Sequence, residues 1–298
     1  MIDKFRKGSN NNALFVTSAC SNRCIMCCQP PKLEDDSDYM FQKNLAVIAA
    51  SDKDNDYVCI TGGEPTLIGD KLFVYMQKIW ENMPDSEIHL LTNGRRFAHV
   101  EYLAEFVQNI KGNIVLGIPF HSDNPLDHDY IAGAKGSFYE TLKGIHNLGL
   151  IGFNIELRII LLQQNYHRLP KIAEFIALNL PFVSQVSIMG LEVIGYAEKR
   201  FKEVWIDPVF CANELARTVA YLELSRIQVR LFNIPLCLLP QHLWKYSCRS
   251  ISSWKQTFIP SCKKCKVKEQ CCGLFSTSKW YSDFILPVQK KSNQKAIE

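Results

Sequence analysis

The sequence lacks the features that would place the protein in a membrane, outside the cell or on nucleic acid. No apolar run reaches about 18 residues, so no transmembrane helix is predicted. The N-terminal segment MIDKFRKGSNNN has no apolar stretch of the kind that a secretory signal needs. The formal net charge is only +4, which does not indicate a nucleic-acid partner. We therefore expect a cytoplasmic protein with no membrane and no nucleic acid among its partners.

Cysteine, by contrast, is abundant, with 12 residues in a chain of 298. In a reducing compartment, so many cysteines indicate metal ligands or catalytic groups rather than disulfides. No internal repeat of solenoid period is present. The length and a hydrophobic content of 47% fit one large α/β domain with an appendage, or two medium-sized domains.

Short β-rich apolar runs alternate with longer segments of helical period. The predicted strands are Ala13–Thr17, Tyr57–Ile60, Ile88–Leu91, Ile114–Pro119, Asn154–Leu162, Gln185–Met189 and Ile227–Phe232. The predicted helices are Met40–Ala50, Lys71–Asn82, Ala98–Gln108, Ser137–Leu148, Leu169–Leu178 and Ala212–Leu224. Ser137 is placed as the N-cap of its helix, and Pro170 in the first turn of the next. Such alternation predicts parallel βαβ units in an α/β sheet or barrel.

The pattern changes near Asn233. From there to Trp280 the chain is rich in Cys, Lys, Ser and Trp, and the periodicity fades. We expect a core of residues 1–232 and a metal-stapled extension of residues 233–298. The segment from Gln289 onward is predicted to be a polar tail that frays.

The first group of cysteines, Cys20, Cys24 and Cys27, has the spacing C-x3-C-x2-C directly after the first predicted strand. Soft thiolates select iron–sulfur clusters, zinc or copper(I). A closed zinc site needs a fourth ligand, which Cys28 or a distant residue would have to supply. Three thiolates instead leave one iron of a four-iron cluster open. Ligand chemistry favours the cluster and keeps zinc as the alternative.

The segment CSNRCIMC resembles the signature of the radical S-adenosylmethionine (SAM) superfamily. The resemblance implies that the three cysteines are catalytic and hold a [4Fe–4S] cluster whose open iron binds SAM. The family usually has an aromatic residue before the third cysteine, beside the adenine of SAM. This chain has Met26 there, which is a soft apolar substitute.

Two further segments fit the same resemblance. Gly62, Gly63 and Glu64 follow the second predicted strand, and they resemble the family segment that binds the amino group of SAM. Paired glycines permit close backbone approach and positive φ, although the segment alone would be an ordinary turn. Thr92 and Asn93 end the third strand near the expected cofactor, where a plain Asn-Gly turn is the alternative.

Two later positions complete the predicted cofactor site. Arg158 interrupts an apolar strand, and a buried charge needs a partner. The carboxylate of SAM and a structural ion pair with Glu156, two residues away on the same strand face, are both open. Gly190 belongs to a glycine-spaced segment that resembles the one whose backbone flanks the adenine, and it too fits a plain turn.

A second group of cysteines lies in the extension. We select Cys237, Cys262, Cys265 and Cys271 as its ligands, with Cys248 and Cys272 as alternatives to Cys237. Four thiolates make either a closed zinc site or an auxiliary [4Fe–4S] cluster. The resemblance favours the cluster, because related peptide-modifying enzymes carry one in such a segment. The surrounding lysines are either a solvated face or a docking patch for an acidic electron donor, and they are Lys263, Lys264, Lys266 and Lys268.

From about Ala13 to Phe275 the chain resembles a narrower group, the C-type radical SAM maturase of the His-Xaa-Ser system. The stretches that carry this resemblance include NIPLCLLP from Asn233 and SISSWK from Ser250. It implies an incomplete (β/α)6 TIM-like barrel, open to a large substrate. The implied activity is reductive cleavage of SAM to a 5′-deoxyadenosyl radical that modifies a ribosomally made peptide with His-Xaa-Ser repeats. A partner radical SAM maturase and a flavodoxin or ferredoxin-type electron donor are expected.

Two alternative functions also fit the sequence. One is a radical SAM maturase for another protein substrate, of the sulfatase or quinohemoprotein type. The other, from a different class, is a non-catalytic zinc-binding module.

Overall fold

A computed structural model describes residues 4–9, 11–32 and 36–289. Its main sheet has eight strands, all parallel and in sequence order. The strands are β1 (Ala13–Phe15), β2 (Tyr57–Thr61), β3 (Glu87–Leu91), β4 (Ile114–Pro119), β5 (Asn154–Ile160), β6 (Gln185–Met189), β7 (Gln228–Phe232) and β8 (Ser247–Cys248). The seven predicted strands are confirmed, each with ends within two residues of the prediction. Only β8 was not predicted.

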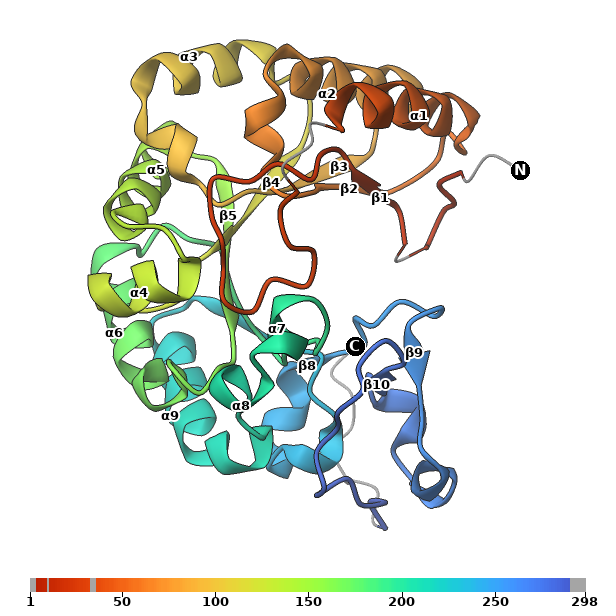
Figure 1. The fold of residues 1–298 in the computed structure, drawn as a ribbon, viewed down its shortest axis with the longest axis vertical. Helices are drawn as coiled ribbons and strands as arrows, with labels where there is room; N and C mark the ends of the chain where they lie inside the picture. The colour runs from red at the N-terminus through yellow and green to blue at the C-terminus, as the bar shows by residue number, and fades with distance from the viewer. Residues whose placement is uncertain (1–3, 10, 33–35, 290–298) are drawn as a thin grey trace.

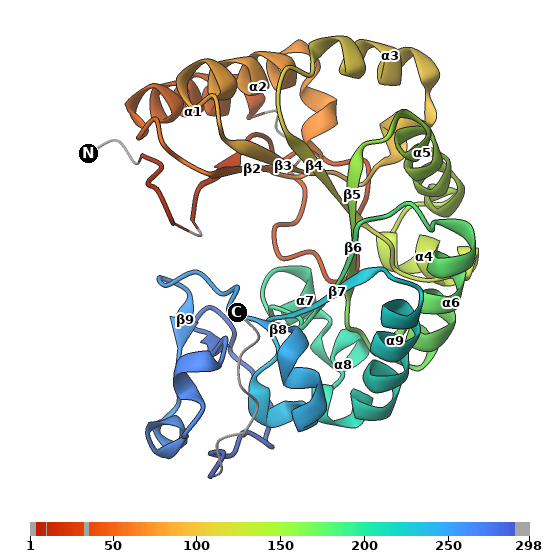
Figure 2. The same ribbon diagram turned by 180° about the vertical axis from the view of Figure 1, so that it is seen from behind.

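Helices cover the outer face of this curved sheet, and β1 and β8 do not pair, so the barrel stays open (Figures 1 and 2). The helices are α1 (Ser37–Ala50), α2 (Asp70–Asn82), α3 (Val100–Asn109), α4 (Pro125–Ala132), α5 (Ser137–Ile151), α6 (Leu169–Asn179), α7 (Tyr196–Lys199), α8 (Phe201–Val204) and α9 (Ala212–Leu224). The six predicted helices are confirmed, and α4, α7 and α8 are additions. The α/β parallel fold is thus the one expected for a TIM-like barrel, with eight strands where a (β/α)6 barrel has six.

The two faces of the sheet differ in chemistry. Residues that face the helices, such as Ile60, Leu116 and Ile188, are fully buried in the main core. Burying each such side chain contributes about 1.5–3 kcal/mol. Because side chains alternate along a strand, their neighbours face the concave side, where polar residues such as His89 and Arg158 lie. The core therefore holds the sheet from outside and leaves a polar interior.

The start of α5 corrects one prediction. Ser137 is the first helical residue and makes no capping hydrogen bond; Gly136 stands at the N-cap position. The carboxylate of Asp129 takes the capping role from α4, because it accepts hydrogen bonds from the Gly136 and Phe138 N–H groups and the Ser137 hydroxyl. Pro170 does occupy the first turn of α6, as predicted.

The extension packs against the barrel. It contains short 3-10 turns and a small antiparallel pair, β9 (Gln256–Thr257) and β10 (Leu274–Phe275). The Lys255 ammonium lies 3.0 Å from the Glu192 carboxylate, which also accepts a 2.6 Å hydrogen bond from Thr277. The division at residue 232 stays a prediction, since the sheet takes β8 from beyond it. Residues 290–298 of the predicted polar tail lie outside the described residues. No helix in the described ranges combines the length and the apolar character needed to cross a membrane.

Candidate functional site

The cysteines of the first group lie on the loop that follows β1, at the C-terminal edge of the sheet. Cys20, Cys24 and Cys27 are each partly exposed. Burial, and then the neighbouring thiolates of Cys27 and Cys20, raises the pKa of Cys24 to about 12. The three thiols are therefore close enough for the charge of one to oppose ionisation of the next. A bound metal supplies the positive charge that deprotonates such thiols.

The donor set fits an iron–sulfur cluster better than a single ion. In the described part of the chain, no three Cys, His, Asp or Glu side chains converge tightly enough to hold one metal ion. Three thiolates can each bind a separate iron of a four-iron cluster, whereas a closed zinc site needs a fourth ligand. Cys20, Cys24 and Cys27 are the residues that would hold the cluster.

The backbone of α4 braces the cysteine loop. The N–H groups of Arg23 and Ile25 donate to the carbonyls of Ala132 and Ile131, both at 3.0 Å. Gly133 has φ 60°, and a Cβ there would lie 2.1 Å from the Arg23 carbonyl oxygen. Glycine is therefore required for this close approach. The sequence pattern around α4 gave no indication of this contact.

The paired glycines bring the β2 loop against the cysteine loop. A Cβ on Gly62 would lie 2.6 Å from the Thr17 carbonyl oxygen, and one on Gly63 would lie 2.1 Å from that of Ala19. The N–H groups of Gly63 and Glu64 donate to these same carbonyls at 2.7 Å. The close approach expected of the glycines is present, but neither has positive φ. Their contact with SAM stays a prediction.

The Glu64 carboxylate joins the loops that follow β2 and β3. It is only 1% exposed and accepts hydrogen bonds from the Thr66 N–H and hydroxyl, the Thr92 hydroxyl and the Asn93 N–H. Burial raises the pKa of Glu64, and the hydrogen bonds from Asn93, Thr92 and Thr66 oppose that rise. The structure thus shows Glu64 hydrogen-bonded to both Thr92 and Asn93, and the contact of these residues with a SAM ammonium group stays a prediction.

The β3 loop also contacts the cysteine loop directly. The Asn93 side chain donates to the Ser21 hydroxyl at 2.8 Å. The Arg95 guanidinium donates to the Ser21 carbonyl at 2.9 Å and to the Asn22 side chain at 2.8 Å. Burial raises the pKa of the Cys20 thiol, whereas the charge of Arg95 acts in the opposite sense. Arg95 was not predicted, although its position directly after Thr-Asn-Gly was a signal.

The β6 loop closes the other side of the site. Gly195 has φ 63°, and a Cβ there would lie 2.6 Å from the Cys27 carbonyl oxygen, which accepts a hydrogen bond from the Tyr196 N–H at 2.9 Å. A Cβ on Gly190 would lie 2.5 Å from the Asn233 carbonyl oxygen. Both glycines are therefore required by backbone packing, and the role of Gly190 beside the adenine stays a prediction.

Met26 and Arg158 lie in different surroundings. Met26 is buried in a small apolar cluster that includes Ile131 and Leu162. Arg158 projects from β5 on the concave face and makes no ion pair within 4 Å with a carboxylate of the described residues. Its charge nevertheless helps to lower the pKa of Glu156. The direct ion pair with Glu156 is therefore not formed, and the contact of Arg158 with SAM stays a prediction.

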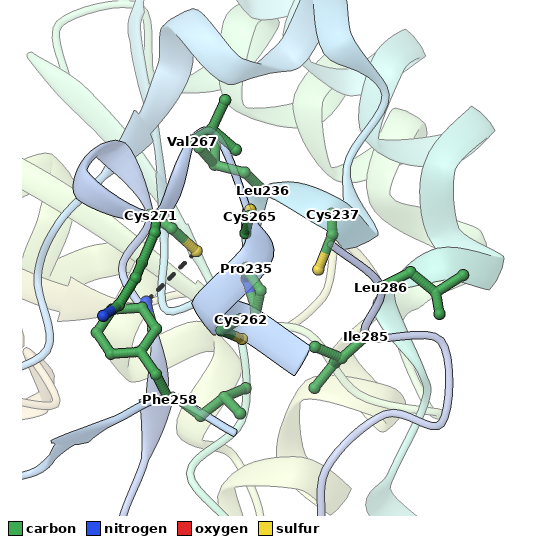
Figure 3. Close-up of a pocket in the computed structure, with 13 residues that line it drawn as sticks. Pro235, Leu236, Cys237, Phe258, Cys262, Cys265, Val267, Cys271, Ile285 and Leu286 are labelled. Atoms are coloured by element: carbon green, nitrogen blue, oxygen red, sulfur yellow. Dashed lines mark hydrogen bonds between the residues drawn. The ribbon is translucent and has the colours of Figure 1, made fainter. Parts of the chain in front are cut away.

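The second group of cysteines surrounds one cavity in the extension. Cys237, Cys262, Cys265 and Cys271 line it together with apolar residues such as Phe258. Figure 3 shows the four side chains around this space. Burial, and then the nearby thiolates of Cys271, Cys262 and Cys265, raises the pKa of Cys237 to about 11. The four thiols fit either metal centre predicted for them, and the auxiliary cluster stays a prediction.

The two alternative ligands lie outside the cavity, although the side chain of Cys272 is hydrogen-bonded to that of Cys271. Cys248 is on β8, where its sulfur is 3.9 Å from the Arg230 guanidinium. Cys272 is fully buried, and its thiol donates to the Gly273 carbonyl at 3.3 Å. Neither lines the cavity of the second group. The structure therefore brings Cys237, rather than these two, to the other three cysteines.

Comparison with known proteins identifies the class. The family model described as the radical SAM superfamily matches residues 14–176, more than half of the chain. The chain therefore belongs to the radical SAM superfamily of enzymes. Membership implies SAM and a [4Fe–4S] cluster as cofactors, which agrees with the thiols of the first group.

Individual relatives are more distant. A GTP 3′,8-cyclase from Desulforamulus reducens is 35% identical over 104 residues, which cover 34% of this chain and 32% of the relative. One from Nautilia profundicola is 25% identical over 169 residues, covering 55% and 51%. The chain thus spans about a third to a half of the length of these curated relatives.

Solved structures show a similar fold. Streptococcus suis SuiB bound to S-adenosylmethionine has a TM-score of 0.55 at 16% identity, and the match covers 74% of this chain and 49% of SuiB. The protein anSMEcpe with bound AdoMet and the Kp18Cys peptide has a TM-score of 0.52 at 13% identity, covering 73% and 62%. At such identities these likenesses concern the fold alone.

Proposed function

We propose that this radical SAM enzyme is a maturase that modifies a ribosomally made peptide with His-Xaa-Ser repeats, together with a partner radical SAM maturase. The observation that carries the proposal is the gathering of Cys237, Cys262, Cys265 and Cys271 around one cavity in an extension beside an open parallel sheet. When bound, the cluster and SAM supply a 5′-deoxyadenosyl radical that abstracts a hydrogen atom from the substrate.

In this proposal, contacts between loops of the chain position the cluster and SAM. The loops after β2, β3 and β6 contact the cysteine loop through Gly63, Asn93 and Gly195. These contacts fix the loop against the C-terminal edge of the sheet, where active sites of β/α barrels lie. The sheet is not closed by pairing of β1 with β8, and the peptide is proposed to reach the concave face from this side; the similarity of fold to anSMEcpe with a bound peptide supports this use.

The lysines beside the second group are proposed to receive the electron donor. Lys263, Lys264 and Lys266 are exposed next to Cys262 and Cys265. Flavodoxins and ferredoxins are acidic, and complementary charge steers such encounters. The second group, if it holds a [4Fe–4S] cluster, would then lie close to the donor.

The proposal has a direct test. The protein is coexpressed with a His-Xaa-Ser repeat peptide and the partner maturase, and the peptide is examined by mass spectrometry. A mass change that requires the first group of cysteines supports the proposal. An unmodified repeat peptide, alongside anaerobic formation of 5′-deoxyadenosine from SAM and dithionite, would point to a maturase of another substrate. Iron with acid-labile sulfide, rather than zinc, excludes the zinc-binding module.

A second candidate follows from the relatives. The 35% identity to a GTP 3′,8-cyclase over 104 residues favours a nucleotide substrate as the alternative. Incubation of the reduced, reconstituted protein with SAM and GTP distinguishes the two candidates. Consumption of GTP would replace the maturase proposal, and formation of 5′-deoxyadenosine without loss of GTP would leave it in place.

A further inference from the structure

Three polar residues form a row across the concave face of the sheet. Arg158 on β5 is the register partner of Ser187 on β6, which is in turn the partner of Arg230 on β7. Register partners in parallel strands point to the same face. Their sequence neighbours, such as Leu157 and Leu231, are buried in the helix-facing core. The row therefore points into the open interior of the barrel.

The carboxylate nearest to this row, that of Glu156, already has partners other than the arginines. One Glu156 oxygen accepts hydrogen bonds from the Ser187 hydroxyl and, at 3.3 Å, from the Gln185 side chain. The other lies 2.8 Å from Nε2 of His89. Burial favours the neutral acid, but His89 and the charge of Arg158 outweigh it and lower the pKa of Glu156 to about 2. Glu156 is thus an anion whose hydrogen bonds go to residues other than the two arginines.

The two arginines have only weak acceptors. Nη2 of Arg158 lies 3.3 Å from the Met189 sulfur, and Nη1 of Arg230 lies 3.9 Å from the Cys248 sulfur. Within the described residues, neither arginine has a carboxylate oxygen within 4 Å. A guanidinium carries five N–H donors, and sulfur is a poor acceptor. The charge of Glu156 offsets one arginine, which leaves the row with a net positive charge.

Gly117 keeps this arrangement open. A Cβ at that position would lie 2.9 Å from Nε2 of His89 and 3.3 Å from Cδ of Arg158. A side chain on β4 would therefore displace His89 or Arg158. The absence of a side chain at Gly117 lets both reach across β4 and β5 into the interior.

The position of the row suits a substrate rather than the core. Adjacent strands lie about 4.8 Å apart, so the Cα atoms of Arg158 and Arg230 are about 10 Å apart, and their long side chains can reach one anion between them. The next row toward the C-terminal edge is Ile160, Met189 and Phe232. The arginines thus lie one layer below the edge at which the cysteine loop sits. Arg230 is exposed and Arg158 half-buried, so both are accessible from the opening.

We propose that Arg158 and Arg230 bind a carboxylate of the substrate in the barrel interior, where paired guanidinium groups recognise a planar carboxylate. This inference rests on the proposed function, because it assigns an acidic peptide as the substrate class. The carboxylate comes either from an Asp or Glu side chain at the Xaa position or from the C-terminus of the peptide. In both cases the anion holds the peptide beneath the cysteine loop.

The experiment measures binding, so it does not depend on turnover. The reconstituted protein with SAM is titrated against labelled, amidated peptides of His-Glu-Ser repeats and of His-Gln-Ser repeats. A third peptide carries His-Gln-Ser repeats with a free C-terminal carboxylate. Anisotropy is recorded for the wild type, Arg230→Gln and the control Arg217→Gln, an exposed arginine of α9 on the outer face.

We expect the wild type to bind one carboxylate peptide at least about tenfold more tightly than the neutral one, and Arg230→Gln to lose this preference. The peptide that is preferred identifies the source of the carboxylate. Equal affinity for all three peptides overturns the inference. So does a loss of SAM affinity in Arg230→Gln with peptide discrimination unchanged, because the row would then serve the cofactor. If discrimination persists in a protein that modifies no peptide, the proposed function fails and the carboxylate site stands.

Discussion

The two groups of cysteines are built in opposite ways. Cys20, Cys24 and Cys27 come from one loop, whose backbone is hydrogen-bonded to α4 and to the β2 and β6 loops. The second group joins Cys237, at the start of the extension, to three cysteines later in the extension, which has few regular elements. The first loop is therefore shaped by the protein core, whereas the extension relies on its own ligands. The difference predicts that metal at the first group serves chemistry and metal at the second group serves folding.

The largest effect is expected from replacing Cys20, Cys24 and Cys27 together with alanine. Formation of 5′-deoxyadenosine should fall to background, because no thiolate remains to hold the catalytic cluster. The melting temperature should change little, because backbone hydrogen bonds shape the loop. Cys28→Ala, at the exposed neighbouring thiol, is the matched control and should retain activity. Continued activity in the triple variant would contradict the assignment of the first group.

The second group should show the reverse pattern. Cys262→Ser combined with Cys265→Ser should halve the iron content and expose the lysines around residue 264 to trypsin, with cleavage about tenfold faster or more. Uncoupled formation of 5′-deoxyadenosine should persist. The control is Cys248→Ser, since that thiol lies outside the cavity. Unchanged proteolysis in the double variant would show that the extension does not depend on its metal.

A smaller effect tests the bracing of the first loop. Glu64→Gln keeps one acceptor oxygen for Thr66 and Thr92 but places an NH2 group against the Asn93 N–H, which donates to the other carboxylate oxygen. We expect a loss of about 2–3 kcal/mol in the free energy of unfolding, measured by urea denaturation. Glu101→Gln, in the exposed first turn of α3, should change it by less than about 0.5 kcal/mol. A Glu64→Gln variant as stable as the wild type would show that the hydrogen bonds of Glu64 do not stabilise the loops after β2 and β3.

The smallest effect concerns pH. Burial lowers the pKa of His128 in α4 to about 4, against a weaker opposing effect of Asp129. Between about pH 6.5 and 4 the unfolded chain binds a proton that the folded chain does not, so stability falls as the pH falls. Between about pH 7 and about pH 5, the lowered pKa of His128 should reduce the free energy of unfolding by about 2 kcal/mol.

His128→Gln tests this attribution, because glutamine does not titrate. Its urea-denaturation stability should fall less on acidification than that of the wild type, by about the same 2 kcal/mol. The buried neighbour His121, whose pKa is also lowered by burial, remains in both proteins. Parallel pH profiles for the two proteins would assign the acid sensitivity to other groups.

Regular structure was predictable where the pattern was local. The apolar runs predicted β2 to β7, and helical periodicity predicted α1, α2 and α9. The short helix α4 was missed because eight residues give little periodicity, although Asn124 followed by Pro125 is a helix-start signal that the structure confirms. The cap of α5 was misassigned because Asp129 acts from a neighbouring helix rather than from the adjacent sequence.

The site was less predictable, because much of it is formed by contacts between segments that are distant in the sequence. The cysteine spacings indicated both groups, and the gathering of Cys237 with the three later cysteines agrees with the predicted ligand set. The sequence did not reveal that Gly133 lies against Arg23, or that Gly117 makes room for His89. Such approaches depend on how two loops or strands meet in space, which no spacing in one segment encodes.

The edges of the open sheet affect the tendency of the protein to associate with other chains. An unpaired edge strand offers its backbone to other chains, and long flat edges promote aggregation. Here the two edges are the shortest strands, β1 with three residues and β8 with two. A truncation after residue 232 would remove β8 and uncover the two residues of β7 that pair with it, Leu231 and Phe232. The extension thus ends the open sheet in a two-residue strand, which offers little backbone for pairing with another chain.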